Sequence, residues 1–156
     1  MANELQGELF YIEADLTTSP DTNLYGTDAN YKLIACATSN GFSAAIAGID
    51  VSNKCTGGYA ASIAGQASFS FSFDGQMAKL VTADQSIKVT NDQLLAAMLA
   101  KKPIFIRSTD EAGSVYREGK VLITAYDETY PNADIATFTA TFTGIGEPRI
   151  AKPVAA

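Results

Sequence analysis

Alternation between apolar and hydroxyl side chains is the strongest pattern in this 156-residue chain. Phenylalanine alternates with serine in residues 67–73, and phenylalanine and alanine alternate with threonine in residues 135–143. Because side chains two residues apart lie on the same face of a strand, both segments predict strands with one apolar and one hydroxyl face. The hydroxyl residues are Ser68, Ser70, Ser72, Thr137, Thr139, Thr141 and Thr143.

Shorter apolar runs, separated by Asp, Asn, Gly and Pro, predict further strands and the loops between them. Strands are expected in residues 8–16, 31–37, 41–49, 104–107 and 115–125. A polar loop is expected at 17–30, a long loop rich in small residues at about 50–66, and an extended C-terminal tail at 147–156. Structureless loops of this length are uncommon in compact domains unless they function or move.

One helix is expected, at about residues 91–101. Thr90 and Gln93 have the spacing of a capping box, apolar side chains at helical spacing follow, and Pro103 stops the helix. A lone helix among strands predicts a mainly β fold, an antiparallel β-sandwich or partial barrel with one short flanking helix. The length suits a single domain covering residues 1–156.

Composition and charge narrow the function. The chain has a net charge of −6, with 47% hydrophobic and 18% charged residues. The acidity argues against a protein that holds nucleic acid by its phosphates, and it is compatible with a surface past which DNA slides without sticking. The first residues lack the features of a secretory signal, and no apolar run approaches the ~20 residues of a membrane span. We therefore expect a protein made in a cytoplasm, without a membrane partner.

The sequence contains few of the residue patterns that catalytic or metal-binding sites require. The chain has no histidine, which excludes Ser-His-Asp and Cys-His catalytic groups and leaves Cys36 and Cys55 without a partner for zinc. We expect both cysteines to be free thiols. The acidic pairs Asp110–Glu111 and Asp127–Glu128 resemble solvated turns more than the carboxylate pair of a glycosidase. We expect no enzyme activity, no metal and no cofactor.

Several motifs, in this order, resemble the phage major tail tube protein family. Members similar in this region carry an Asp-Val-Ser/Thr, a nearby lysine and a Gly-Gly-aromatic group before the next strand. The matching segments here are residues 49–54 (IDVSNK), 57–59 (GGY), 101–103 (KKP), 119–121 (GKV) and 138–146 (FTATFTGIG). The resemblance covers roughly residues 40–147.

The resemblance implies a structural subunit of the virion tail, assembled into stacked hexameric rings that form a channel for DNA ejection. Its partners would be copies of itself, other tail proteins at the tube ends, and double-stranded DNA that passes without tight binding. We expect the long loop to be mobile in the free subunit and ordered between neighbours. Its suspected inter-subunit residues are Asp50, Lys54, Gly57, Gly58 and Tyr59.

The seven hydroxyl residues are suspected to line the lumen of the tube, because an ordinary exposed sheet face usually includes Lys and Glu. The alternative is that these hydroxyls meet a neighbouring subunit or are simply solvated. Two other functions also stay open. One is a soluble β-sandwich binding module, and the other is the tube protein of a related contractile injection system.

Overall fold

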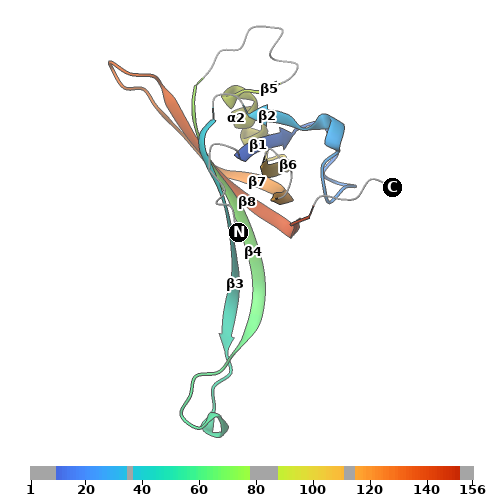
Figure 1. Ribbon diagram of the computed structural model, residues 1–156, viewed down its shortest axis with the longest axis vertical. Coiled ribbons are helices and arrows are strands. Elements are labelled where there is room, and N and C mark those ends of the chain that lie inside the picture. Colours follow the sequence, from blue (N-terminus) through green and yellow to red (C-terminus); the bar gives the residue numbers. More distant parts are fainter. Residues whose placement is uncertain (1–9, 35–36, 78–87, 111–114, 152–156) are drawn as a thin grey trace, which may run out of the picture.

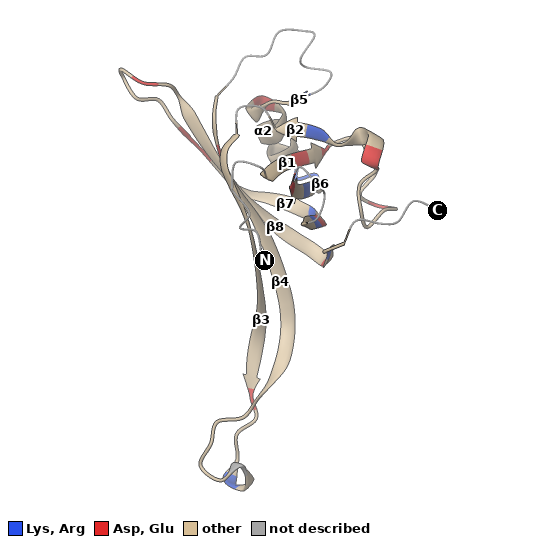
Figure 2. Cartoon of the chain, in the orientation of Figure 1, with Lys and Arg blue, Asp and Glu red and all other residues tan. Residues whose placement is uncertain are grey.

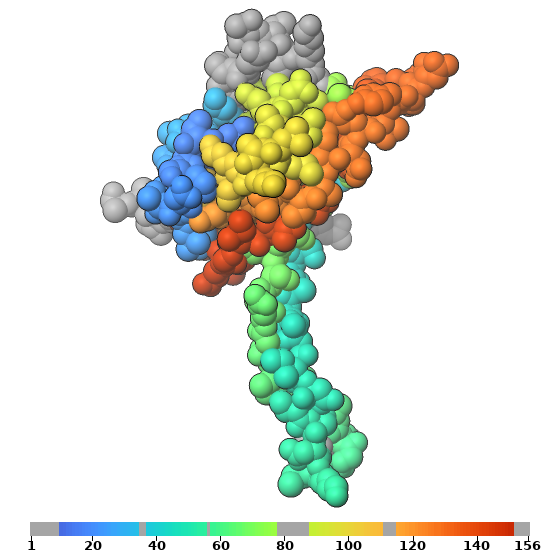
Figure 3. Space-filling view, turned by 180° about the vertical axis from the view of Figure 1, so that it is seen from behind, coloured from blue at the N-terminus to red at the C-terminus, as the bar shows by residue number. Residues whose placement is uncertain are grey.

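The computed structural model describes residues 10–34, 37–77, 88–110 and 115–151. The features expected at Glu8, Cys36, Glu111 and residues 152–156 lie outside these ranges. A body built around the core carries one long hairpin that projects far beyond it (Figure 1). A space-filling view from behind shows the same hairpin as a narrow extension of the body (Figure 3).

Eight strands form one mixed sheet in the order β3-β4-β8-β7-β6-β1-β2-β5. The strands are β1 (Phe10–Asp15), β2 (Lys32–Ile34), β3 (Ala37–Asp50), β4 (Ser62–Gln76), β5 (Lys88–Val89), β6 (Ile104–Asp110), β7 (Tyr116–Thr129) and β8 (Thr137–Arg149). Neighbouring strands are antiparallel except β2 and β5. The expected mainly β fold is confirmed. In detail the strands form a single mixed sheet that does not close into a barrel, where the sequence suggested an antiparallel β-sandwich or partial barrel.

The flanking helix, α2 (Asn91–Leu99), begins and ends as its local sequence dictates. The Thr90 hydroxyl accepts a hydrogen bond from the Gln93 amide, and the Gln93 side chain accepts one from the Thr90 amide. This is the predicted capping box. At the other end Lys101 has φ 55°, and the amides of Lys101 and Lys102 donate to the carbonyls of Met98 and Ala97. This left-handed ending stops the helix before Pro103.

The core lies on the apolar face of the sheet and is covered by α2. It contains the five phenylalanines of the alternating strands, as predicted, together with Leu94 of the helix. Phe69 has a special position, because its ring lies against the backbone of Gly119 and Gly144. A Cβ at Gly119 would lie 2.5 Å from Cζ and 2.7 Å from Cε2 of Phe69, and one at Gly144 would lie closer still. Two glycines therefore make the space that the Phe69 ring fills.

Two predicted boundaries need correction. The long loop covers only residues 51–61, because residues 62–66 belong to β4, where residues 62–64 pair with β3. The expected C-terminal tail starts later than residue 147, because β8 continues to Arg149, which is opposite Glu118. Small side chains hid the first extension, since Gly and Ala give little strand signal of their own. Pro148 hid the second, because proline ordinarily argues against a strand.

Residues 16–31, which we call the strap, fold back over the polar face of β6 and β7. The buried Asp15 carboxylate organises them by accepting hydrogen bonds from the amides of Thr17, Thr18 and Thr27, each at 2.9 Å. Burial works to raise the pKa of Asp15, but these hydrogen bonds and one from the Thr18 hydroxyl outweigh it and hold the pKa below its ordinary value. The strap is thus tied to the body by an ionised group.

Candidate assembly surface

The projecting hairpin is the most prominent surface feature, and we call residues 44–68 the arm. β4 pairs with β8 only from Ser70 to Gln76, so beyond Ser70 it pairs with β3 alone. The arm carries side chains that find no cover in the subunit, such as Ile46, Ile49 and Ile63. An isolated two-stranded ribbon is marginally stable in water. The arm therefore presents an apolar surface that its own chain does not bury.

The arm ends in a defined turn, which we call the arm tip (residues 50–61). The Asp50 carboxylate accepts from the Ser52 amide at 2.8 Å, and the Ser52 hydroxyl accepts from the Ala61 amide at 2.7 Å. Gly57 and Gly58 have φ of 65° and 85°, conformations that glycine adopts without strain. The two glycines therefore shape a specific turn, and flexibility is not needed to explain them.

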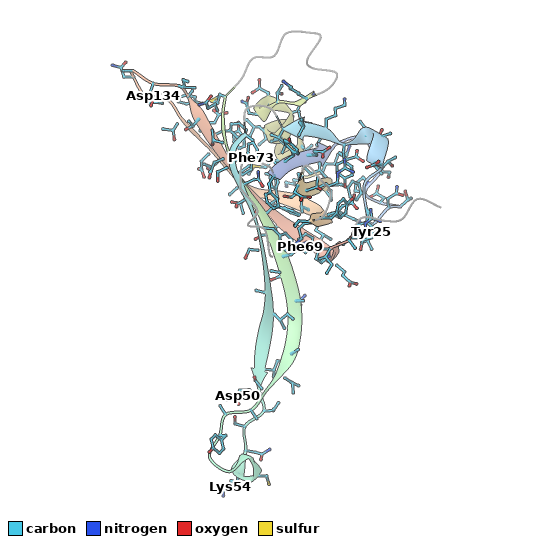
Figure 4. All side chains as sticks on the ribbon, in the orientation of Figure 1. Tyr25, Asp50, Lys54, Phe69, Phe73 and Asp134 are labelled. Atoms are coloured by element: carbon cyan, nitrogen blue, oxygen red, sulfur yellow. The ribbon has the colours of Figure 1, made fainter. Side chains whose placement is uncertain are left out.

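All five suspected inter-subunit residues lie together at the arm tip. Figure 4 labels Asp50 and Lys54 there, at the end of the molecule farthest from the body. The Tyr59 side chain is 82% exposed. Lys54 is the one cation in residues 37–77, and no interaction partner for it lies within the described part of the chain. The tip thus offers an exposed aromatic ring and an ammonium group that pairs with none of the described residues.

The seven suspected lumen residues lie on one face, which we call the hydroxyl face. Ser70 is directly opposite Thr143, and Ser72 is directly opposite Thr141, so the two strands present their hydroxyls side by side. Ser43 of β3 continues the face at Ser70. The phenylalanines between these hydroxyl residues are buried. The alternation in the sequence therefore describes one continuous surface over three strands.

Two acids, Asp74 and Asp127, belong to this face. Asp127 and Glu128 were expected in a solvated turn but lie in β7, and Asp110, expected likewise, is buried at the end of β6. Asp74 of β4 is opposite Thr139 of β8, and Thr139 is opposite Asp127 of β7. The three residues form a row across the strands with carboxylates at both ends. Residues 37–50, 62–77 and 121–148 contain no Lys or Arg. The hydroxyl face is therefore uncharged or negative, as the tan and red colouring in Figure 2 shows.

Two strand edges near this face are open. Among the described residues, β3 is the last strand of the sheet and pairs on one side only, with β4. β7 pairs with β6 only up to Val121, so within the described residues 122–129 pair only with β8. The open edges lie on opposite sides of the β3-β4-β8-β7 portion. Unpaired backbone groups of this kind are templates for pairing with another chain.

The polar face under the strap holds the most perturbed ionisable groups. Arg107 pairs with Glu13 at 2.9 Å and with Asp28, and its guanidinium lies 4.2 Å from the centre of the Tyr31 ring. Burial, with a hydrogen bond to Glu118, raises the pKa of Tyr31 well above its ordinary value. Glu118 also pairs with Arg149.

Two guanidiniums and three carboxylates pair with one another and link the strap to the sheet, so these groups form a structural network. The cavities found among the described residues are lined by other side chains. The same residues contain no cluster of His, Cys, Asp and Glu suited to a metal ion. None of their helices has the length and apolar character to cross a membrane.

Comparisons with known proteins identify the fold. The chain matches no protein-family model and no curated protein. It is similar in structure to a protein in the tail of an empty gene transfer agent (GTA) particle with C6 symmetry, at 18% identity and a TM-score of 0.71, covering 96% of this chain and 100% of that one.

Two further structures are similar. One is the SPP1 tail tube, at 12% identity and a TM-score of 0.65, covering 96% of this chain and 80% of the other. The second is a protein in the 6-fold symmetrised baseplate of the anti-feeding prophage, at 10% identity and a TM-score of 0.61, covering 96% of both chains. The chain therefore has the tail tube protein fold, and the expectation drawn from its motifs is confirmed at that level.

Proposed function

We propose that this chain is a non-enzymatic structural subunit of a phage-type tail tube, which assembles into stacked hexameric rings around a channel for DNA. The likeness to tail tube structures over 96% of the chain carries the proposal. The GTA tail has C6 symmetry, and the anti-feeding prophage baseplate is 6-fold symmetrised. The subunit would then be made in the host cytoplasm and function in the virion tail, with other tail proteins at the tube ends.

The open edges of the sheet support assembly into a ring. Edge-to-edge pairing of β3 from one copy with residues 122–129 of β7 from the next uses two different surfaces of the same chain. Contacts of this heterologous kind close into a ring when the rotation between copies closes. Pairing would also continue the hydroxyl face from one copy to the next. The hydroxyl faces of all copies would then lie on the same side of the ring wall.

We place the hydroxyl face on the lumen. DNA must move through the tube without being held, and binding to its phosphates depends on Lys and Arg. Hydroxyl groups keep the surface wet, while Asp74 and Asp127 add negative charge on either side of Thr139. An aqueous wall without positive charge is what the proposed function requires.

Negative-stain electron microscopy of the purified protein over a wide concentration range tests the assembly. Six-membered rings and tubes are the expected result. A species that stays monomeric at every concentration, without rings in virions, would contradict the proposed function.

A lysine in the hydroxyl face tests its placement. The Thr139→Lys variant should form normal tubes that bind a short DNA duplex in a salt-dependent manner, whereas Thr139→Gln, of similar size and uncharged, should form tubes that do not. Ser70→Lys should behave like Thr139→Lys. Loss of ring formation in either lysine variant, with rings retained in the glutamine control, would instead identify this face as a subunit interface.

The likeness to the anti-feeding prophage baseplate favours a second candidate, the tube of a contractile injection system. The subunit would assemble in the same way, but its tube would be enclosed in a sheath and would not deliver a genome. Electron microscopy of particles that contain the chain distinguishes the two candidates by the presence of a sheath and of packaged DNA.

A further inference from the structure

The two ends of the molecule differ in chemistry. Figure 4 shows Lys54 at one extreme, on the arm tip, and Asp134 at the opposite extreme, on the β7–β8 hairpin. When copies stack in one orientation along this long axis, the arm of each copy extends toward the opposite end of the next. In such a stack, the end of one copy that carries Asp134 would face the arm tip of the next copy.

The outer part of the β7–β8 hairpin is acidic and partly apolar. Residues 121–148 contain no Lys or Arg, whereas Lys88, Lys101 and Lys102 flank α2. The acids of this part of the hairpin are Asp127, Glu128 and Asp134. Tyr130 and Ile135, at the hairpin end, are 69% and 55% exposed. We call Tyr130, Asp134 and Ile135 the hairpin patch.

The arm tip has the complementary properties. Lys54 has no partner in the described part of its own chain, and Tyr59 and Val51 are exposed. The hydrogen bonds of Asp50 to Ser52 and of Asn53 to Cys55 set the backbone that carries Lys54. The arm tip thus carries an exposed ring and a cation, and the hairpin patch carries exposed apolar groups and a carboxylate. If the two surfaces meet, each covers the apolar area of the other and the opposite charges pair.

We propose that the arm tip of one subunit docks on the hairpin patch of a second copy in the adjacent ring, with Lys54 paired to Asp134 and Tyr59 packed against Tyr130 and Ile135. This inference rests on the proposed function, because it needs stacked rings. It goes further by naming the second surface of the inter-ring contact. Asp134 uses Oδ1 to accept from the Ile135 amide at 2.7 Å, which leaves Oδ2 for an ammonium group.

A single exposed ion pair contributes little, but the contact repeats around the ring. In a hexameric ring the same pair occurs at six places in each junction, and linked contacts multiply rather than add in their effect on the equilibrium constant. A small loss in each contact therefore becomes a large change in the concentration at which tubes grow. Salt should weaken the junction, because the charges are near the surface.

Charge reversal tests the pairing. Lys54→Glu and Asp134→Lys should each raise the concentration needed for tube growth by about tenfold or more, while rings still form. The double variant Lys54→Glu/Asp134→Lys restores opposite charges and should return growth toward that of the original protein. Asp21→Lys, which reverses an exposed acid on the strap, is the matched control and should leave growth unchanged.

Rings and tubes are counted separately, by microscopy and by sedimentation, so that two failures can be told apart. If the original protein forms no rings, the proposed function fails. If it forms tubes and the single variants grow equally well, or if the double variant grows no better than either single variant, the docking contact is refuted while the proposed function stands.

Discussion

The Phe69 ring should be very sensitive to its two glycine neighbours. In Gly119→Ala, the new methyl group would lie 2.5 Å from Cζ of Phe69, whereas carbon atoms in contact prefer about 3.5–4.0 Å. The ring would have to move by roughly 1 Å. It has little room to do so, because Gly144 lies against it and the rings of Phe42 and Phe71 are each 6.1 Å away, centre to centre.

The cost follows from overpacking in a close-packed core. Insertion of a methyl group into such a site costs about 1–3 kcal/mol of unfolding free energy. For a chain of this size each kcal/mol corresponds to about 2–4 °C in melting temperature, so Gly119→Ala should melt roughly 2–12 °C lower. Thermal and urea unfolding of the purified subunit, followed by circular dichroism, measure both quantities.

Two further variants make the reasoning refutable. Gly48→Ala adds the same methyl group on the arm, where a Cβ would meet nothing within 4 Å, and should leave the melting temperature nearly unchanged. Gly119→Ala/Phe69→Leu removes the ring that the methyl group hits. Its loss should be smaller than the sum of the two single losses by about 0.5–3 kcal/mol. Strictly additive losses would mean that the Phe69 contact is not the cause.

Three other predictions concern the tip, the strap and the helix end. Tyr59→Ala should change the melting temperature by no more than about 2 °C yet weaken tube growth. Hydrogen exchange of residues 51–61 should slow on assembly. Equal exchange in free and assembled protein would contradict an interface at the arm tip. The depressed pKa of Asp15 means that its stabilisation is present above about pH 4 and is lost as pH falls through the folded value. Asp15→Asn should therefore cost about 1–3 kcal/mol at pH 7 and less at pH 3, in urea titrations at both pH values. Lys101→Gly should raise stability by roughly 0.5–1 kcal/mol in the same assay, because glycine adopts the left-handed conformation without strain.

The sequence predicted the features that depend only on residues close together in the chain. The alternating segments showed which side chains are buried, because a strand has only two faces and the face that carries the phenylalanines packs into the core. The capping box located the start of α2 because Thr90 and Gln93 satisfy backbone amides by themselves. Neither inference needed to know which strands are neighbours.

Strand pairing decided the features that were missed. Residues 62–66 are mostly Ser, Ala, Gly and Gln, which have weak strand preference, and they are extended because β3 provides a partner at Ile49 and Asp50. The row Asp74, Thr139 and Asp127 exists only through the register of three strands. The strap contacts join residues about 80 positions apart, such as Asp28 and Arg107, and no sequence spacing indicates them.

The open edge of β3 gives the subunit a vulnerability that the proposed ring would remove. Between its two irregularities the strand runs from Ser39 to Ile46 without Lys or Pro, the residues that commonly protect an edge from unwanted pairing. In the proposed ring, every such edge would pair with the next copy. A substitution that slows ring closure therefore exposes the edge for longer in the cell, and its phenotype should be insoluble protein made from subunits that are individually well folded.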